Sequence, residues 1–238
     1  MTLRAAFLAA GLLALAAHPT TAQRPVPVDL ELSFVVDASG SIDSEEMRLQ
    51  RQGYADALAT PQVIKAVTSG FLRSIAITYI EFAADGCIWQ WVDWVQITDL
   101  AAARSAGAKI MAAPRELCSG GNAIGEAVAF ATKSTLQNGF DGTRKVIDVS
   151  GDGPDTTGAI AVEDARDAAI AQGFTINGLV VERPSMPSLP DYYRAAIIGG
   201  PRSFVIRAEG RKTFAEAILK KLILEIADTG GYQQAEWK

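Results

Sequence analysis

The sequence predicts an α/β fold: a doubly wound, mainly parallel sheet with one antiparallel edge strand and helices on both faces, in a Rossmann-like arrangement. Apolar, β-branched segments alternate along the chain with segments of helical periodicity, which is the order that a parallel sheet requires. The segments 74–82 and 88–97 are the exception, because the turn between them is so short that they must pair antiparallel. With 49% hydrophobic and 21% charged residues, the composition is that of a globular protein.

The first strand is predicted to run from Leu30 to Val36, and the helical pattern behind it opens at Asp43 and ends at Thr60-Pro61. The same alternation continues to the end of the chain. Strands are predicted at 74–82, 88–97, 145–149, 174–181 and 203–207, and helices at 100–112, 124–136, 161–172 and 213–227. In such a sheet, ligands bind beyond the carboxyl ends of the strands, so the turns there are the expected place for function.

Residues 1–22 have the pattern of a secretory signal peptide. Arg4 supplies a positive start, an apolar stretch runs from Ala5 to Ala17, and Thr20 to Ala22 offers small residues for cleavage. We therefore expect an exported protein, periplasmic or secreted. The only histidine, His18, would leave with the signal, which excludes Ser-His-Asp catalysis and histidine-ligated zinc from the mature chain. The expected organisation is a signal peptide at 1–22, a linker at 23–29, one domain at 30–229 and a tail at 230–238.

The charge of the chain argues against two classes of partner. The formal net charge is −5 and becomes −6 once Arg4 is removed, and the chain has no basic run. Nucleic acid and anionic lipid are therefore not expected as ligands. The apolar stretches of the mature chain are too short to span a membrane, and we expect a monomer.

One carboxylate and two hydroxyls follow the first strand at alternate positions, as Asp37, Ser39 and Ser41. Hard oxygen ligands of this kind suit Mg²⁺ or Mn²⁺ rather than a soft metal. Two more polar residues are expected at the same end of the sheet, Asn122 at the entry to a helix and Asp152 just past a later strand. A simpler interpretation is that Asp37 and Ser39 only cap the helix that follows them.

Taken together, Asp37-x-Ser39-x-Ser41, the glycine-rich loop at Asn122 and the Asp-Gly pair at Asp152 resemble the metal-ion-dependent adhesion site of von Willebrand factor type A domains. The resemblance covers about 28–228, with the elements in the order of that fold. More narrowly, the chain is similar to an exported bacterial family of unknown function within this superfamily, in the segments 146–154, 192–194 and 198–201.

The resemblance implies that Ser39 and Ser41 bind the cation directly and that Asp37 and Asp152 act largely through bound water. A carboxylate from a protein partner would fill the open coordination position. Where these sites carry threonine this sequence has Asn122, whose amide oxygen can ligate a hard cation but lies on a longer side chain. The expected function is thus recognition of a protein partner through Mg²⁺ or Mn²⁺. The alternative is a metal-free interaction or scaffold domain in which Asn122 marks a degenerate site.

An enzyme is not expected, although one resemblance points that way. The segment from Gly151 to Asp155, Gly-Asp-Gly-Pro-Asp, is similar to the metal motif of haloacid dehalogenase-type phosphohydrolases. The nucleophile motif of those enzymes is Asp-x-Asp, whereas here Ser39 takes the second acidic position. Without that acid the leaving group would go unprotonated.

Two cysteines and one loop complete the candidate surface. Cys87 and Cys118 are an even pair in an exported chain and are both expected at the metal end of the sheet, so we expect a disulfide, with two free thiols as the alternative. The proline-rich loop after the strand 174–181 is a candidate partner rim. Its candidate contact residues are Pro184, Met186, Pro187 and Leu189.

Three other features are interpreted as structural. Asp148 lies inside a strand and needs a partner if it is buried. Trp89 and Trp91 share a strand face and are expected to pack under a helix rather than to form a sugar platform. The closing helix is expected to pack on the core through Phe214, Ile218, Leu222 and Ile226.

Overall fold

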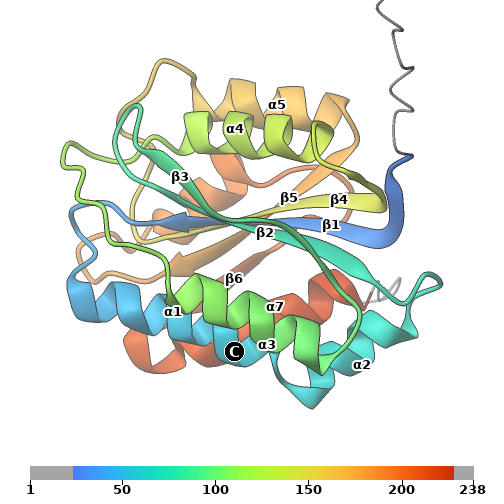
Figure 1. Cartoon of the computed structure of the whole chain (residues 1–238). Coiled ribbons are helices and arrows are strands. Elements are labelled where there is room, and N and C mark those ends of the chain that lie inside the picture. The colour runs from blue at the N-terminus through green and yellow to red at the C-terminus, as the bar shows by residue number, and fades with distance from the viewer. Residues whose placement is uncertain (1–23, 228–238) are drawn as a thin grey trace, which may run out of the picture.

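The computed structural model describes residues 24–227, which form a six-stranded sheet between two layers of helices (Figure 1). The strand order is β3-β2-β1-β4-β5-β6, and neighbouring strands are parallel except for β2 and β3. The predicted fold class is confirmed. The strands are β1 Val26–Asp37, β2 Ile75–Phe82, β3 Ile88–Ile97, β4 Phe140–Gly151, β5 Phe174–Val181 and β6 Val205–Ala208. The helices are α1 Ser44–Leu58, α2 Pro61–Ser69, α3 Leu100–Met111, α4 Ile124–Leu136, α5 Val162–Ala171, α6 Leu189–Tyr192, the π-helical turn η1 Tyr193–Ile197 and α7 Arg211–Ile226.

The strand β1 lies inside the sheet and is buried on both faces, as expected for an inner parallel strand. Phe34 faces the layer of α1, α2, α3 and α7, where its ring packs against that of Tyr54 with 4.9 Å between centroids. Val35 faces the opposite layer of α4, α5 and η1. Figure 1 shows these two layers above and below the sheet. Because β1 has neighbours on both edges and both faces, its carboxyl end at Asp37 is held in a fixed position.

The beginning of the sheet differs from the prediction. The strand β1 starts at Val26, inside the segment 23–29 that was expected to be a linker, and Val28 is fully buried. This extension pairs with the first residues of β4, which itself begins at Phe140 rather than near residue 145. The two prolines of the segment suggested a linker. Proline is nevertheless compatible with the start of a strand, where a missing ladder N–H costs little.

The helix α2 was not predicted, because Thr60-Pro61 was interpreted only as the end of α1. The same pair also begins α2: the Thr60 hydroxyl accepts a hydrogen bond of 3.3 Å from the amide of Val63, and Pro61 occupies the first turn. Proline suits that position because the first amides of a helix have no partner within it. The helical segment 189–197, formed by α6 and η1, was also missed.

Of the features interpreted as structural, Asp148 and the closing helix behave as predicted, whereas Trp89 and Trp91 are only partly buried. Asp148 is buried and has a partner, since the ammonium of Lys221 lies 2.6 Å from its Oδ1. The rings of Trp89 and Trp91 stack on one strand face, 6.1 Å apart and 7° from parallel. The apolar side chains expected on the closing helix are all buried in the core, namely Phe214, Ile218, Leu222 and Ile226.

Within residues 24–227, the helices are all too short or too polar to cross a membrane. The predicted signal peptide at 1–22 and the predicted tail at 230–238 lie outside the described residues.

Candidate metal site at the carboxyl edge of the sheet

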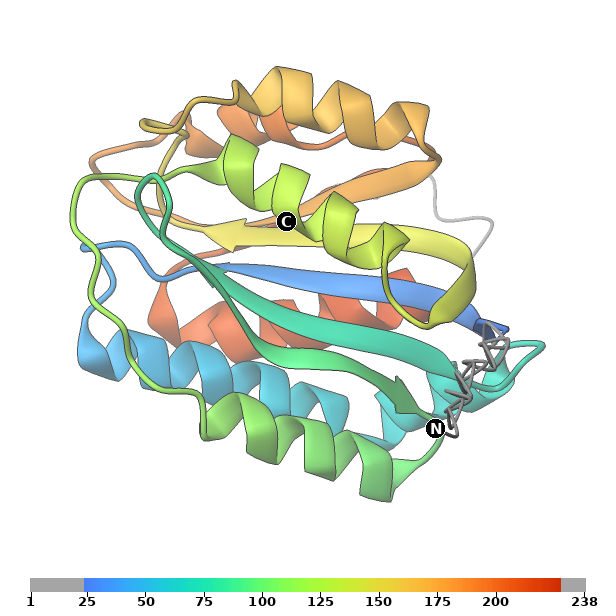
Figure 2. The same ribbon diagram turned by 45° about the horizontal axis from the view of Figure 1, so that its top comes forward.

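The site is built on the ends of two neighbouring parallel strands. β1 ends at Asp37 and β4 ends at Gly151, and the register pairs Val36 with Ser150, so the next residues of both strands leave the sheet side by side. Figure 2 shows the loops that follow β1 and β4 gathered at this edge, at the left of the view. The carboxylate of Asp37 accepts a hydrogen bond of 2.8 Å from the amide of Ser39 and one of 3.5 Å from that of Asp152.

The two serine hydroxyls complete a continuous set of oxygens. The Ser39 and Ser41 hydroxyls are 3.0 Å apart, and Ser41 donates a hydrogen bond of 3.0 Å to Oδ1 of Asp152. The structure thus brings together four of the five residues predicted to form the site. The simpler interpretation, that Asp37 and Ser39 cap α1, is wrong, because the side chain of Asp43 accepts the hydrogen bonds from the first amides of that helix.

Asn122, the fifth residue, lies next to the Asp152 loop. A Cβ atom on Gly153 would stand 2.6 Å from Nδ2 of Asn122, so the amide group packs directly against the backbone one residue beyond Asp152. The backbone of Asn122 is held by Thr156, whose hydroxyl accepts its amide at 2.9 Å and whose own amide bonds its carbonyl at 2.8 Å. The hydrogen bonds of its main chain therefore position Asn122 at the site, and its side-chain amide packs against Gly153.

The electrostatics of the site favour a bound cation. Burial and the nearby Asp152 carboxylate raise the pKa of Asp37 from 3.8 to about 6. Among the described residues, Asp37 forms no ion pair with a Lys or Arg that would offset its charge. Burial raises the pKa of Asp152 as well, although the Arg183 guanidinium opposes that shift. Two desolvated carboxylates beside two hydroxyls are a donor set that fits a hard divalent cation.

The candidate metal site does not consist only of the side chains that most often bind metals. In the part of the chain that the structure describes, no group of three or more His, Cys, Asp and Glu side chains is arranged to hold a metal ion. The candidate set contains only two carboxylates, and its other oxygens come from hydroxyls and an amide. The residues fit a cation that accepts neutral oxygen ligands, such as Mg²⁺ or Mn²⁺, rather than zinc in a structural site.

Two residues at the site were not predicted. The guanidinium of Arg183 forms an ion pair with Oδ2 of Asp152, and Arg183 lies just beyond the carboxyl end of β5, the strand next to β4. The buried hydroxyl of Tyr193 has no hydrogen-bond partner in the described part of the chain. A Cβ on Gly151 would stand 2.8 Å from that hydroxyl and 2.9 Å from Oδ2 of Asp37, so glycine at this position leaves the room that both groups occupy. For Arg183, its position just after the end of a predicted strand was a sequence signal that could have placed it at the site.

The proline-rich loop is partly as expected. Pro184, Met186 and Pro187 are exposed beyond the end of β5. Leu189 is not a rim residue, because it is only 3% exposed and packs in the core with the helices α4 and α5. It begins α6, and the apolar face of that short helix has to be buried. The prediction of a rim at Leu189 was therefore wrong.

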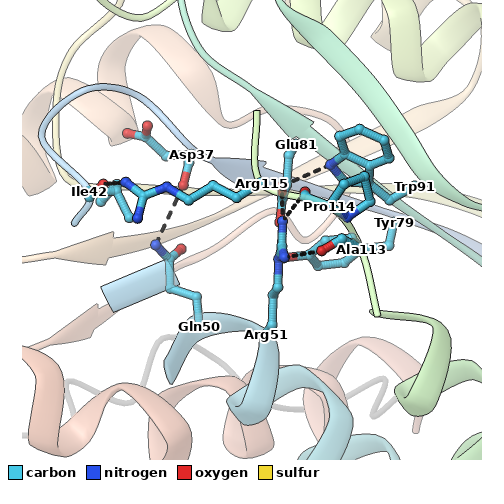
Figure 3. A network of polar contacts seen from close by, with 10 residues as sticks. All are labelled: Asp37, Ile42, Gln50, Arg51, Tyr79, Glu81, Trp91, Ala113, Pro114 and Arg115. Carbon is cyan, nitrogen blue, oxygen red and sulfur yellow. Dashed lines mark hydrogen bonds and ion pairs between the residues drawn. The ribbon is translucent and has the colours of Figure 1, made fainter. Parts of the chain in front are cut away.

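The helix α1 supports the site from below, as Figure 3 shows. Its Gln50 side chain donates a hydrogen bond of 3.4 Å to the carbonyl of Asp37. The next residue, Arg51, pairs with Glu81 at 2.7 Å and donates to the carbonyls of Ala113 and Pro114. One helix turn thus holds both the end of β1 and the start of the loop that leads to Asn122.

The predicted disulfide between Cys87 and Cys118 is present. It ties the turn between β2 and β3 to the loop that precedes Asn122. The same two segments are joined by a hydrogen bond of 2.8 Å from the amide of Ala123 to the carbonyl of Ala83. The loop that carries Asn122 is therefore fixed to the sheet at two points.

Removing this disulfide should lower the free energy of unfolding by about 2–4 kcal/mol, because the bridge closes a loop of moderate length in the unfolded chain. The Cys87→Ser/Cys118→Ser double variant should show this loss in urea unfolding. Reductant should weaken the wild type to a similar level and leave the variant unchanged. Equal stability of the two proteins under oxidising conditions would contradict the prediction.

Asp155 has a structural role that the phosphohydrolase alternative did not anticipate. Its Oδ1 accepts hydrogen bonds of 2.7 Å and 3.2 Å from the amides of Ile124 and Gly125. It therefore caps the N-terminus of α4, where a negative charge is favourable. The last residue of the similarity from Gly151 to Asp155 is therefore accounted for without a catalytic metal.

Several solved structures share this fold. The proximal thread matrix protein 1 from the mussel byssus matches with a TM-score of 0.59 at 14% identity, over 85% of this chain and 47% of that one. The pilus adhesin SpaC from Lactobacillus rhamnosus GG matches with a TM-score of 0.59 at 13% identity, over 85% of this chain and 31% of that one. This chain thus spans less than half of either protein. The vWF domain of the type V pili tip protein Mfa5 from Porphyromonas gingivalis matches with a TM-score of 0.58 at 11% identity, over 90% and 99%.

These likenesses show the von Willebrand factor A fold and confirm the predicted resemblance. A further structure of the mussel protein, with a TM-score of 0.53, is described as having a zinc-occupied MIDAS motif, the metal-ion-dependent adhesion site. A comparison with curated proteins gives no match. The profile of one family matches residues 27–230, which is most of the chain and includes all five candidate site residues. This chain therefore belongs to the family described as Protein of unknown function (DUF1194).

Proposed function

We propose that this chain is an exported protein-binding domain that recognises its partner through a divalent cation, Mg²⁺ or Mn²⁺. Asp37, Ser39, Ser41, Asn122 and Asp152 would hold the cation, and an acidic side chain of the partner would complete its coordination. The observation that carries the proposal is the run of hydrogen bonds that joins Asp37, through the amide of Ser39 and the hydroxyls of both serines, to Asp152 at the ends of two adjacent strands.

The geometry gives each residue a distinct task. The Ser41 hydroxyl donates its proton to Asp152, so it accepts the hydroxyl of Ser39 with one lone pair and keeps the other for a metal. Asp37 is oriented by two backbone amides and supplies charge beneath the serines. A divalent cation bound there would offer an open coordination position to a carboxylate oxygen. Because the hydroxyls are neutral, they would leave the cation with most of its charge for the partner.

The comparisons support a binding role rather than an enzymatic one. The neighbours include a matrix protein, a pilus adhesin and a pilus tip protein. The disulfide supports export, because such bonds persist mainly in oxidising compartments. Residues 24–227 also contain no histidine that could act as a general base beside the Ser39 and Ser41 hydroxyls. A monomeric, periplasmic or secreted domain agrees with all of these observations.

Millimolar Mg²⁺ or Mn²⁺ should raise the melting temperature of the purified protein. Ligand at 100 times its dissociation constant stabilises a protein by about 2.7 kcal/mol, which corresponds to roughly 5–10 °C for a domain of this size. Thermal unfolding with the metal, and again with EDTA, measures the shift. Ser41→Ala should abolish it because the variant lacks a central oxygen.

Ser44→Ala is the matched control, since Ser44 begins α1 and its hydroxyl contacts Arg115 rather than Asp152. This variant should keep the full metal-dependent shift. A shift that survives in Ser41→Ala would place the metal elsewhere, and absence of a shift in the wild type would argue against a resident cation.

The second candidate function is a metal-free interaction domain. It is favoured by the ion pair of Arg183 with Asp152, which gives one of the two carboxylates a partner without any metal. Asn122 in place of threonine points the same way. Under this alternative the Asp37→Ala variant would bind its partner normally, whereas the metal-dependent function predicts that binding is lost while the fold is retained.

A further inference from the structure

The carboxylate of Asp152 has two oxygens in different surroundings. Oδ1 accepts the hydroxyl of Ser41 at 3.0 Å, on the side of the two serines. Oδ2 carries the guanidinium of Arg183, which reaches it from the loop after β5. The side chain of Asp152 is only 5% exposed, whereas that of Arg183 is 31% exposed. The buried partner is therefore fixed at the end of β4, and the exposed partner is the one that can move.

We propose that Arg183 and a divalent cation compete for Asp152, so that Arg183 sets how tightly this site holds its metal. The inference rests on the proposed function, because it assumes that the oxygens of Asp37, Ser39, Ser41 and Asp152 are the metal ligands. It assigns Arg183 a role at the site in addition to those of the five candidate ligands.

The charges at the site explain the competition. Asp37 and Asp152 together carry two negative charges, and the Arg183 guanidinium leaves a net charge of only −1 for an incoming dication. The guanidinium also repels that dication from a short distance, in a site whose acidic groups are buried. The Arg183 guanidinium therefore weakens binding of the cation by Asp152, and a bound cation weakens the ion pair between Asp152 and Arg183.

The position of Arg183 makes the exchange feasible. It stands at the base of a loop whose following residues, 184–188, are exposed, and among residues 24–227 only the ion pair with Asp152 ties its side chain to the site. Turning the guanidinium outward breaks no backbone pairing of β5, because that strand ends at Val181. Releasing Asp152 from Arg183 would thus break only one ion pair, whose guanidinium is already partly exposed.

Arg115 provides a matched comparison. Its guanidinium also lies at this edge of the domain, but it contacts the hydroxyl of Ser44 and, at 3.1 Å, the carbonyl of Ile42 (Figure 3). Arg115→Gln therefore makes the same change in net charge as Arg183→Gln without touching Asp152. Arg183→Lys keeps the charge at the tested position.

The experiment is a Mn²⁺ titration followed by electron paramagnetic resonance, which distinguishes free from bound Mn²⁺ and needs no partner. Arg183→Gln should bind Mn²⁺ at least tenfold more tightly than the wild type, because the repulsion between one charge and a dication about 5 Å away exceeds this factor even at the dielectric constant of water. Arg183→Lys should remain close to the wild type, and Arg115→Gln should change affinity much less than Arg183→Gln. Adding Ser41→Ala to Arg183→Gln should remove the gain, which ties the bound Mn²⁺ to this site.

The possible results separate the competition from the proposed function. Tighter binding by Arg183→Gln supports the competition, even if the wild type alone binds no Mn²⁺. Equal binding by the wild type and Arg183→Gln overturns the competition while the metal site stands. An equal gain in Arg115→Gln also overturns it, because the effect would then be one of net charge only. Absence of binding in every variant overturns both.

Discussion

Replacing Lys221 with Met should lower the free energy of unfolding by about 3–5 kcal/mol at neutral pH, because it would leave two buried carboxylates without their shared cation. Lys221 is fully buried on α7, where its ammonium lies 2.6 Å from Asp148 and also pairs with Glu225. Asn177 donates a further hydrogen bond of 2.9 Å to Glu225. Methionine matches the length of the side chain, so the loss would come from charge rather than from a cavity.

The loss in free energy of unfolding caused by Lys221→Met should depend on pH. Burial raises the pKa of Asp148 from 3.8 to about 7, against the opposing effect of the Lys221 ammonium. Between about pH 4 and pH 7 the folded state therefore binds more protons than the unfolded state, and the contribution of Asp148 to stability falls as the pH rises. Without the ammonium its pKa would rise further, so the deficit of Lys221→Met should be larger at pH 8 than at pH 5.

Urea unfolding of the wild type and Lys221→Met at pH 5 and pH 8 measures both effects. Lys133→Met is the matched control, because Lys133 lies exposed near the end of α4 and its replacement should change stability little. A deficit below about 1 kcal/mol at both pH values would mean that the two carboxylates are neutral in the wild type or reach water in the variant.

A loss of similar size, about 3–5 kcal/mol, is expected for Arg51→Met. Arg51 donates two hydrogen bonds of 2.7 Å to Glu81, whose side chain is 2% exposed (Figure 3). The variant would retain the Glu81 hydrogen bonds from Trp91 and Tyr79, of 2.8 and 3.1 Å, but neither donor carries a charge. The carbonyls of Ala113 and Pro114 would also lose their donor, which should loosen the loop toward Cys118.

Urea unfolding again measures the loss, and Arg48→Met is the control on the same helix. Arg48 is exposed and pairs with Glu45 at the surface, so its replacement should have little effect. The fluorescence of Trp91 should change in Arg51→Met and not in Arg48→Met, because only the first variant alters the charge beside its indole. Equal stability of the two variants would show that Glu81 does not depend on Arg51.

Most of the fold could be predicted because it depends on local patterns. The apolar strands and the periodic helices were recognised from their own residues, and the short turn after Phe82 required the antiparallel edge. One error occurred where distant residues decide the structure, because the strand at Val26 is ordered by its pairing with Phe140. Another was local, because Thr60-Pro61 begins α2 as well as ending α1. The need of Asp148 for a partner was predicted, but Lys221 on the last helix could not be named from the sequence.

The candidate site was predictable to a similar extent. Asp37 and Asp152 could be placed together because parallel neighbouring strands end at the same edge, and the serines follow Asp37 within a few residues. The directions of the Arg183 and Leu189 side chains could not be predicted from the sequence, since the direction of a side chain in a loop depends on what packs around it. One turns inward to a carboxylate and the other is buried in the core.

The central place of β1 also determines how the domain would carry a mechanical load. The strand begins at Val26, at one end of the sheet, and leads directly to Ser39 and Ser41 at the other, while β2 and β4 are bonded along its two edges. Tension between Val26 and a partner held at the serines would run along the axis of β1. Because both points of attachment would lie on the same strand, the covalent backbone of β1 would carry the load, and its hydrogen bonds to β2 and β4 would carry little of it.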